Sequence, residues 1–329
     1  MAIVAEHERA ASASPSASPG WEGPELSIVV TCYNEAPGIE EFHRRLRKTL
    51  DEIGRSSEIV MVNDGSDDDT WEKLLAIQRR DDTVTLLDLF RNAGQCAAIS
   101  AGIADAKGRH FVFMDSDLQL DPEELPLLVA AFDRDQDVVN GIRRERHDPL
   151  LRRIPSFFAN FVLRRLAQVP FTDFGCSFQV MRGELVRAHE FGPTKPFNNV
   201  LVTRSAGRFA EVPVNHHERP YGSSGWSTLA LWRYLLDNVV LYSQGVFQWF
   251  SLGALAVALL TFVRIFLPGR ILGDVTNGLM LNAMLLGTAT VLAVVAFVGE
   301  YVLRTFSVHA RGPLYVVRER RPAARYWGD

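Results

Sequence analysis

The chain has 329 residues, enough for one large or two medium domains, and 47% of them are hydrophobic. Its 35 basic and 39 acidic residues give a formal net charge of −4, which provides no reason to expect nucleic acid as a partner. Residues 1–23 are rich in Ala, Ser and Pro and carry charges where a signal peptide needs an apolar core, so we expect a disordered tail there.

An alternation of apolar strands and amphipathic helices follows the tail. Strands are expected at Leu26–Cys32, Glu58–Val62, Val84–Leu89, Phe111–Met114 and Val138–Gly141. Helices are expected between them, including Thr70–Arg79 and the small-residue segment Cys96–Ala106, which can pack closely on a sheet. The pattern predicts an α/β fold with a mostly parallel sheet, flanking helices and right-handed crossovers. No G-x-G-x-x-G follows the first strand, so a nicotinamide or flavin site lacks its main support.

Two carboxylates follow the strand Phe111–Met114, whose four apolar residues suit a central strand covered on both faces. Asp115 and Asp117 point to the same side of an extended chain, at the strand end where open α/β sheets bind ligands. They repel each other unless a cation lies between them. Oxygen ligands without nearby His or Cys favour Mg²⁺ or Mn²⁺ carrying a diphosphate, with a simple polar turn as the alternative. Asp121-Pro122 then predicts a helix capped by Asp121.

Four motifs at strand ends occur in a fixed order along the chain. They are Thr31-Cys32-Tyr33-Asn34-Glu35, Val62-Asn63-Asp64-Gly65-Ser66, Arg91-Asn92-Ala93-Gly94-Gln95 and Asp115-Ser116-Asp117-Leu118-Gln119-Leu120-Asp121-Pro122. In order and spacing the chain resembles the family 2 glycosyltransferases with the GT-A fold. Among these it is most similar to the bacterial polyprenyl-phosphate sugar transferases, which places the catalytic domain at residues 24–225.

This resemblance implies a nucleotide-sugar donor and a metal ion. It assigns the metal to Asp115 and Asp117, and the donor to Thr31, Tyr33, Glu35, Asn63, Asp64, Arg91, Asp115, Ser116 and Gln119. The residues alone leave alternatives open, because Tyr33 can be a packed aromatic and Asp64 a turn or cap residue. The resemblance favours UDP as the nucleotide, with GDP as the alternative, and it also suggests a homotetramer.

The acceptor side is expected between residues 143 and 225. An amphipathic helix near residues 150–169 suits a membrane interface, although a solvated helix fits the same pattern. We expect Arg143, Arg152 and Arg219 to clamp the acceptor phosphate, and Arg152 and Ser156 match the spacing of an Arg and a Ser that contact phosphate in the resembled family. Asp173 can act as a base or brace a loop.

An edge strand is expected at Ala210–His217, followed by a loop that the resemblance also places on the acceptor side. The loop keeps Arg219, Gly222 and Ser224 of the family's Arg-x-x-Gly-x-Ser-Lys-Tyr pattern. It has Gly225 where the family has Lys, so no role can be transferred from that lysine.

Two uncharged segments, 238–263 and 275–299, each exceed the roughly 20 residues that span a bilayer core. They predict a transmembrane hairpin at 238–303, preceded by a juxtamembrane helix at 226–237 and followed by a basic tail at 304–329. Because arginines crowd that tail, the catalytic domain and both termini are expected in the cytosol, at the inner membrane of a bacterium. A buried hairpin in a soluble protein is the alternative.

The expected reaction is sugar transfer, with inversion, from a nucleotide-diphosphate sugar to a polyprenyl phosphate such as undecaprenyl phosphate. With a second pKa of about 6, a phosphate acceptor needs no strong base at neutral pH. A hydroxyl acceptor on a glycolipid or lipid-linked saccharide is an alternative and would need a base such as Asp173. A catalytically dead membrane scaffold is disfavoured because both Asp115 and Asp117 are present. A processive polysaccharide synthase is disfavoured because two spans cannot enclose a channel.

Overall fold

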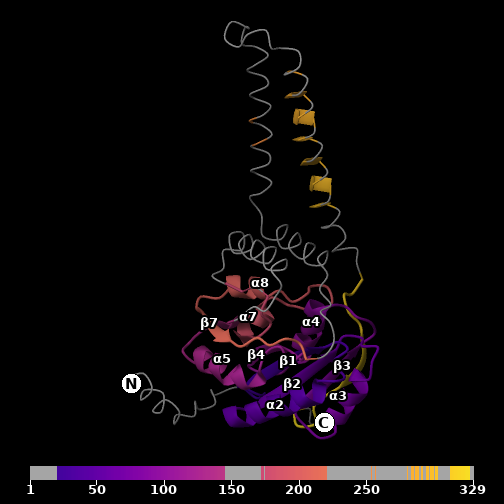
Figure 1. Cartoon of the computed structure of the whole chain (residues 1–329), viewed down its shortest axis with the longest axis vertical. Coiled ribbons are helices and arrows are strands. Elements are labelled where there is room, and N and C mark those ends of the chain that lie inside the picture. The colour runs from indigo at the N-terminus through magenta and orange to yellow at the C-terminus, as the bar shows by residue number, and fades with distance from the viewer. Residues whose placement is uncertain are drawn as a thin grey trace.

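A computed structural model of the protein describes residues 21–144, 172–173, 175–220 and 312–326, with scattered helical residues between 253 and 302. These residues contain an eight-stranded sheet in the order β7-β5-β6-β4-β1-β2-β3-β8 (Figure 1). Its strands are β1 (Leu26–Cys32), β2 (Ser57–Asn63), β3 (Val84–Leu89), β4 (His110–Asp115), β5 (Val138–Arg143), β6 (Gln179–Arg182), β7 (Phe209–Val214) and β8 (Val317–Arg321).

The central strands are parallel, as predicted. β1 lies between β2 and β4, and β2 pairs with β3. In this register Thr31 lies opposite Asp115, and Cys32 lies opposite Asn63. The motifs that end these strands therefore meet at the carboxyl edge of the sheet, where ligands bind in open α/β folds.

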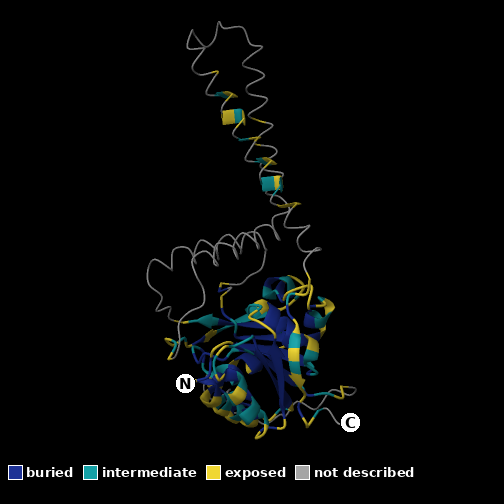
Figure 2. Cartoon of the chain, turned by 90° about the vertical axis from the view of Figure 1, so that its right-hand side faces the viewer, coloured by how far each residue is buried: buried dark blue, intermediate teal, exposed yellow. Residues whose placement is uncertain are grey.

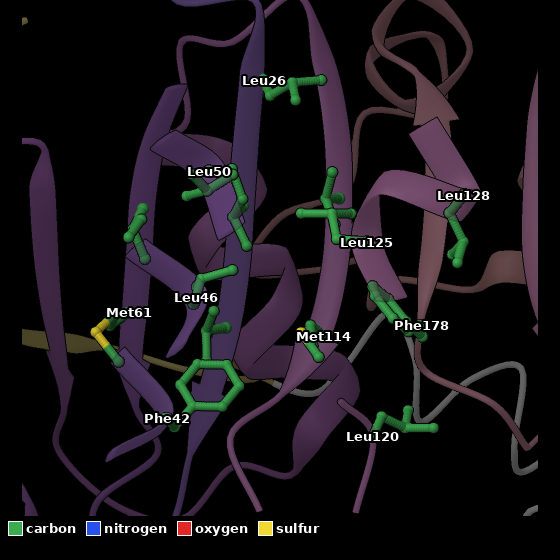
Figure 3. Packing of buried hydrophobic residues seen from close by; sticks show 14 of the residues in the cluster. Leu26, Phe42, Leu46, Leu50, Met61, Met114, Leu120, Leu125, Leu128 and Phe178 are labelled. Atoms are coloured by element: carbon green, nitrogen blue, oxygen red, sulfur yellow. The ribbon is translucent and has the colours of Figure 1, made fainter. Parts of the chain in front are cut away.

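Helices cover both faces of the sheet (Figure 1). One face carries α2 (Ile39–Ile53), α3 (Thr70–Gln78) and α5 (Leu125–Phe132), with the short 3-10 helix η2 (Pro122–Glu124) leading into α5. Phe42, Leu46 and Leu50 recur every four residues on α2, and Figure 3 shows them against Met61 of β2 and Met114 of β4. The strands are buried between the layers, while the outer faces of the helices are exposed (Figure 2).

The other face carries α4 (Gln95–Asp105), α7 (Gly183–Ala188) and α8 (Asn199–Arg204). α4 lies especially close to the sheet, as its small residues predicted. A Cβ atom added at Gly102 would lie 2.5 Å from Cγ1 of Val29 and 3.3 Å from Cγ2 of Val62. This close approach fixes the start of α4, and with it Gln95, beside the ends of β1 and β4.

Two strands differ from the expected arrangement. β6, which was not predicted, runs antiparallel between β4 and β5, whereas the edge strand predicted at Ala210–His217 is present as β7. At the opposite edge, the expected basic tail at 304–329 instead contains β8, which pairs antiparallel with β3. Strands at an exposed sheet edge commonly carry charged residues. The charged sequence of β8 therefore resembles that of a solvated tail.

The predicted membrane segments at 238–263 and 275–299 and the interface helix near 150–169 lie outside the described residues, apart from scattered positions. Over the part of the chain that the structure describes, no helix has the length and apolar character needed to cross a membrane. Five of the scattered positions are helical and carry large apolar side chains that are 56–66% exposed: Met284, Leu286, Val291, Val295 and Val302.

Candidate active site

The carboxylate of Asp115 is held by side chains from three elements. Its Oδ1 accepts hydrogen bonds from Nε2 of Gln95 at 2.6 Å and from Oγ1 of Thr31 at 3.3 Å. Its Oδ2 accepts one from Oγ of Ser177 at 2.7 Å. Ser177 was not among the predicted residues. Ser177 lies just before β6, and β6 pairs with β4, which brings Ser177 to Asp115. Its position before a strand was the signal in the sequence that could have identified it.

Asp117 lies in the turn after β4 and is buried. The backbone N–H of Gln119 donates to its Oδ1 at 3.1 Å, and Nη2 of Arg219 donates to its Oδ2 at 2.7 Å. Nη1 of the same guanidinium lies 3.8 Å from Oε1 of Glu35. The structure therefore brings the predicted residues Glu35, Asp117 and Arg219 together, from segments far apart in sequence.

Negative charge exceeds positive charge in this cluster. Burial, together with the charges of Asp117 and Asp115, raises the pKa of Glu35 to about 7, although Arg219 opposes the shift. Burial and the neighbouring Asp117 also raise the pKa of Asp115. Among the described residues, three buried or half-buried acids thus face one guanidinium, and a further cation would stabilise them.

The donor atoms fit Mg²⁺ or Mn²⁺. Mg²⁺ is commonly bound through one or two carboxylates together with waters and substrate phosphates. Asp115 and Asp117 would supply two such carboxylates. Among the described residues, no group of three or more His, Cys, Asp or Glu side chains is arranged to hold a metal ion. An ion at these two aspartates would therefore take its remaining ligands from water and from the diphosphate.

The loops after β2 and β3 are bound to each other. Oδ1 of Asp64 accepts the N–H of Ala93 at 2.7 Å, and its Oδ2 accepts the N–H of Gly94 at 3.0 Å. Gly65 has a φ of +64°, and a Cβ atom there would lie 2.4 Å from the carbonyl carbon of Arg91. Asp64 therefore braces the neighbouring loop, a role beyond the turn or cap role that the sequence left open, and burial raises its pKa.

The remaining predicted donor residues line the same edge. Tyr33 is 45% exposed, which argues against a packed core aromatic, and Arg91 is exposed as well. Oγ of Ser116 donates to the carbonyl of Thr31 at 2.8 Å. The carbonyl of Gln119 accepts the N–H of His217 at 2.9 Å, which connects the segment carrying Arg219 to the turn around Asp117.

Asp121 does not cap the following helix, contrary to the prediction. Its side chain makes no cap hydrogen bond. Its Oδ1 instead accepts from Nη2 of Arg45 at 2.6 Å, and its Oδ2 lies 2.7 Å from Nε2 of His217. Charged partners from α2 and from the segment after β7 take the carboxylate because ionic hydrogen bonds are stronger than a neutral cap contact. Pro122 does occupy the first turn, as expected.

On the predicted acceptor side, Arg143 and Asp173 form a bidentate ion pair. Nε of Arg143 lies 2.8 Å from Oδ2 of Asp173, and its Nη2 lies 2.9 Å from Oδ1. Asp173 is buried, and its Oδ1 also accepts the N–H of Gly175 at 3.1 Å. A carboxylate held in this way is a poor base, so the contacts favour the loop-bracing role. Arg152 and Ser156 lie outside the described residues.

Comparisons with known proteins fit this geometry. Residues 27–189 match the model of glycosyl transferase family 2. An undecaprenyl-phosphate 4-deoxy-4-formamido-L-arabinose transferase of Pseudomonas aeruginosa is 34% identical over 303 residues, which cover 89% of each chain. The protein of the same name from Edwardsiella ictaluri is 33% identical over 317 residues, covering 90% of this chain and 95% of that one. The chain belongs to glycosyl transferase family 2.

This glycosyltransferase also resembles solved structures at greater distance. Glucosyl-3-phosphoglycerate synthase of Mycobacterium tuberculosis in complex with UDP is 19% identical, with a TM-score of 0.49 over 69% of this chain and 86% of that one. A likeness of this size assigns no ligand. The family match includes Asp115, Asp117 and Ser177, whereas Arg219 and β8 lie beyond residue 189. The contribution of these later segments to the site therefore rests on the contacts in the structure and not on the family match.

Proposed function

We propose that this glycosyltransferase moves a sugar from a nucleotide-diphosphate sugar to a polyprenyl phosphate at the cytosolic face of the bacterial inner membrane. The main supporting observation is the acidic cluster of Glu35, Asp115 and Asp117 with Arg219 at the carboxyl edge of the sheet. Two relatives, 34% and 33% identical, are named for transfer to undecaprenyl phosphate, which makes that lipid the proposed acceptor. A UDP-sugar is the proposed donor.

In this proposal Asp115 and Asp117 hold Mg²⁺ or Mn²⁺. When bound, the cation supplies positive charge that stabilises the departing nucleoside diphosphate. Gln95, Thr31 and Ser177 keep the Asp115 carboxylate in one orientation. Such preorganisation matters because a charged group that is already oriented need not reorganise during the reaction.

The acceptor is a phosphate, so the protein's task on that side is mainly positioning. Arg219 already lies beside the acidic cluster, where its guanidinium can bind the acceptor phosphate next to the donor. Arg152 and Ser156 are proposed to bind the same phosphate. Asp173 orients Arg143 through the bidentate pair. The phosphate oxygen of the acceptor attacks the anomeric carbon with inversion, and the bond from that carbon to the diphosphate oxygen breaks, which releases the nucleoside diphosphate.

A hydroxyl acceptor is less well supported. It would require a general base, and Asp173 was the side chain predicted for that role. Its two oxygens are engaged by Arg143, which favours the ionised and hydrogen-bonded state of the carboxylate over proton abstraction. The geometry therefore favours an acceptor that carries its own negative charge.

The membrane arrangement is proposed from the sheet and the sequence together. The described chain leaves the catalytic domain after residue 220 and returns at residue 312 to form β8 on the same sheet. Any membrane crossing between these points must be matched by a return crossing, which agrees with a hairpin at 238–303. Exposed apolar helical positions such as Met284 and Leu286 also suit contact with lipid.

Transfer of a radiolabelled sugar tests the proposal directly. The full-length protein in detergent, supplied with Mn²⁺ and a panel of UDP- and GDP-sugars, is expected to label undecaprenyl phosphate with one of them. Activity should disappear in EDTA and return with added Mn²⁺. Labelling of a glycolipid hydroxyl instead, or of no lipid with any donor, would refute the assignment.

A further inference from the structure

The C-terminal strand β8 reaches a buried carboxylate at the end of β3. Nη1 of Arg318 lies 3.2 Å from Oδ2 of Asp88, whose side chain is 3% exposed. Nη2 of Arg318 donates to the carbonyl of Phe90 at 2.9 Å, and the guanidinium lies 5.3 Å from the centroid of the Phe90 ring. The N–H of Phe90 in turn donates to the carbonyl of Val316 at 3.0 Å. Arg318 therefore contacts the last residues before the Arg91-to-Gln95 loop.

Asp88 also connects Arg318 to the loop after β2. Its Oδ1 accepts from Nδ2 of Asn63 at 2.8 Å, and Asn63 is itself buried. Oδ1 of Asn63 accepts from Oγ of Ser66 at 2.6 Å, and that oxygen accepts the N–H of Asn34 at 3.0 Å. A continuous set of hydrogen bonds thus runs from β8 to the loop that carries Tyr33 and Glu35.

The loops at the end of this path are the ones that carry the proposed donor residues. Asp64 follows Asn63 directly and holds the N–H groups of Ala93 and Gly94. Gln95, at the end of the same loop, orients Asp115. A change in the orientation of Asn63 would therefore move both the loop after β2 and the loop after β3, because Gly65 packs directly on Arg91.

We propose that Arg318 is a positioning residue for the nucleotide donor. It balances the buried charge of Asp88, and Asp88 then holds Asn63 and the loops around the donor in place. The inference rests on the proposed donor site. It gives the segment that follows the predicted membrane hairpin a role in sugar transfer, since a strand added after the hairpin completes the support of the donor loops.

The chain offers a matched control on the same strand. Nε of Arg320 lies 2.6 Å from Oδ2 of Asp105 at the end of α4, an element that contains neither Asn63 nor Asp88. Arg318→Gln and Arg320→Gln each remove one ion pair from β8. Only Arg318→Gln should disturb the donor loops.

Binding of UDP with Mn²⁺ to the full-length protein, measured by calorimetry, is the primary test. Arg318→Gln should weaken UDP binding by about fivefold to tenfold, which corresponds to the net contribution of one typical hydrogen bond. The donor KM should rise in parallel, with kcat and the acceptor KM unchanged. Arg318→Lys should recover part of the affinity, and Arg320→Gln should bind UDP as the wild type does. Equal weakening in both Gln variants, or in neither, would overturn the role of Arg318.

A double-mutant cycle with Asp88→Asn tests whether Arg318 acts through Asp88. An amide at position 88 still accepts from Asn63 but no longer needs a cation. Arg318→Gln should then have little further effect on UDP affinity, and additive losses would contradict the proposed route. If Arg318→Gln does not fold, the double variant and Arg318→Lys carry the test. If the wild-type protein binds neither UDP nor GDP, the proposed donor site itself is refuted.

Discussion

The guanidinium of Arg143 binds both carboxylate oxygens of Asp173, with N–O distances of 2.8 Å and 2.9 Å. The two side chains are 17% and 4% exposed, so the pair is largely shielded from water. β5 supplies the arginine, and Asp173 belongs to the segment that precedes β6. The pair therefore fastens the predicted acceptor-side segment to the sheet.

Asp173→Asn should destabilise the protein by about 3–5 kcal/mol, because it removes the negative charge that Asp173 places beside the largely buried guanidinium of Arg143. Thermal unfolding followed by tryptophan fluorescence would measure the loss. The double variant Asp173→Asn with Arg143→Gln should recover part of it. Normal stability together with a large fall in kcat would instead indicate that Asp173 is a base.

Asp117→Asn should reduce turnover by about 1000-fold or more, since a catalytic cation supplies several kcal/mol of transition-state stabilisation. Mn²⁺ binding, followed by electron paramagnetic resonance, should weaken in the same variant. Asp82→Asn, which removes a charge at an exposed position, serves as the control and should leave both properties unchanged. Near-normal turnover in Asp117→Asn would show that the metal assignment is wrong.

Glu35 predicts a pH dependence of stability in the absence of metal. Its pKa rises from 4.5 to about 7 in the folded protein because the side chain is buried near Asp117 and Asp115. Between these values the folded state binds more protons than the unfolded state, so stability falls as pH rises through this range. Tm measured in EDTA should fall from pH 5 to pH 8, and Glu35→Gln should lessen the fall. An equally steep fall in the variant would exclude Glu35 as the cause.

The position of β8 predicts where the C-terminus lies. Because β8 pairs with β3, a C-terminal tag should be cleaved by protease only from the side that carries the catalytic domain. Inside-out membrane vesicles should expose the tag, and intact spheroplasts should protect it. A tag inserted at Pro268-Gly269 should show the opposite behaviour. Cleavage of the C-terminal tag from the side opposite the catalytic domain would be incompatible with the strand pairing.

Much of the fold follows from the sequence alone. β1 and β3 have the predicted bounds, and α3 begins at the predicted Thr70. These elements are specified by near neighbours, through apolar runs for buried strands and apolar spacing for helices. Asp115 and Asp117 were likewise predicted together, since only Ser116 separates them and no distant contact is needed to place them on one side of an extended chain.

Only the tertiary structure decided which distant groups meet. Strand β8 pairs with β3 through backbone hydrogen bonds, which leave little mark on side-chain pattern, so its charged sequence resembled a solvated tail. Ser177 reaches Asp115 because β6 enters the sheet beside β4. Asp121 pairs with Arg45 and His217, which lie far from it in sequence. Such contacts depend on strand order and loop path, and local periodicity contains no information about either.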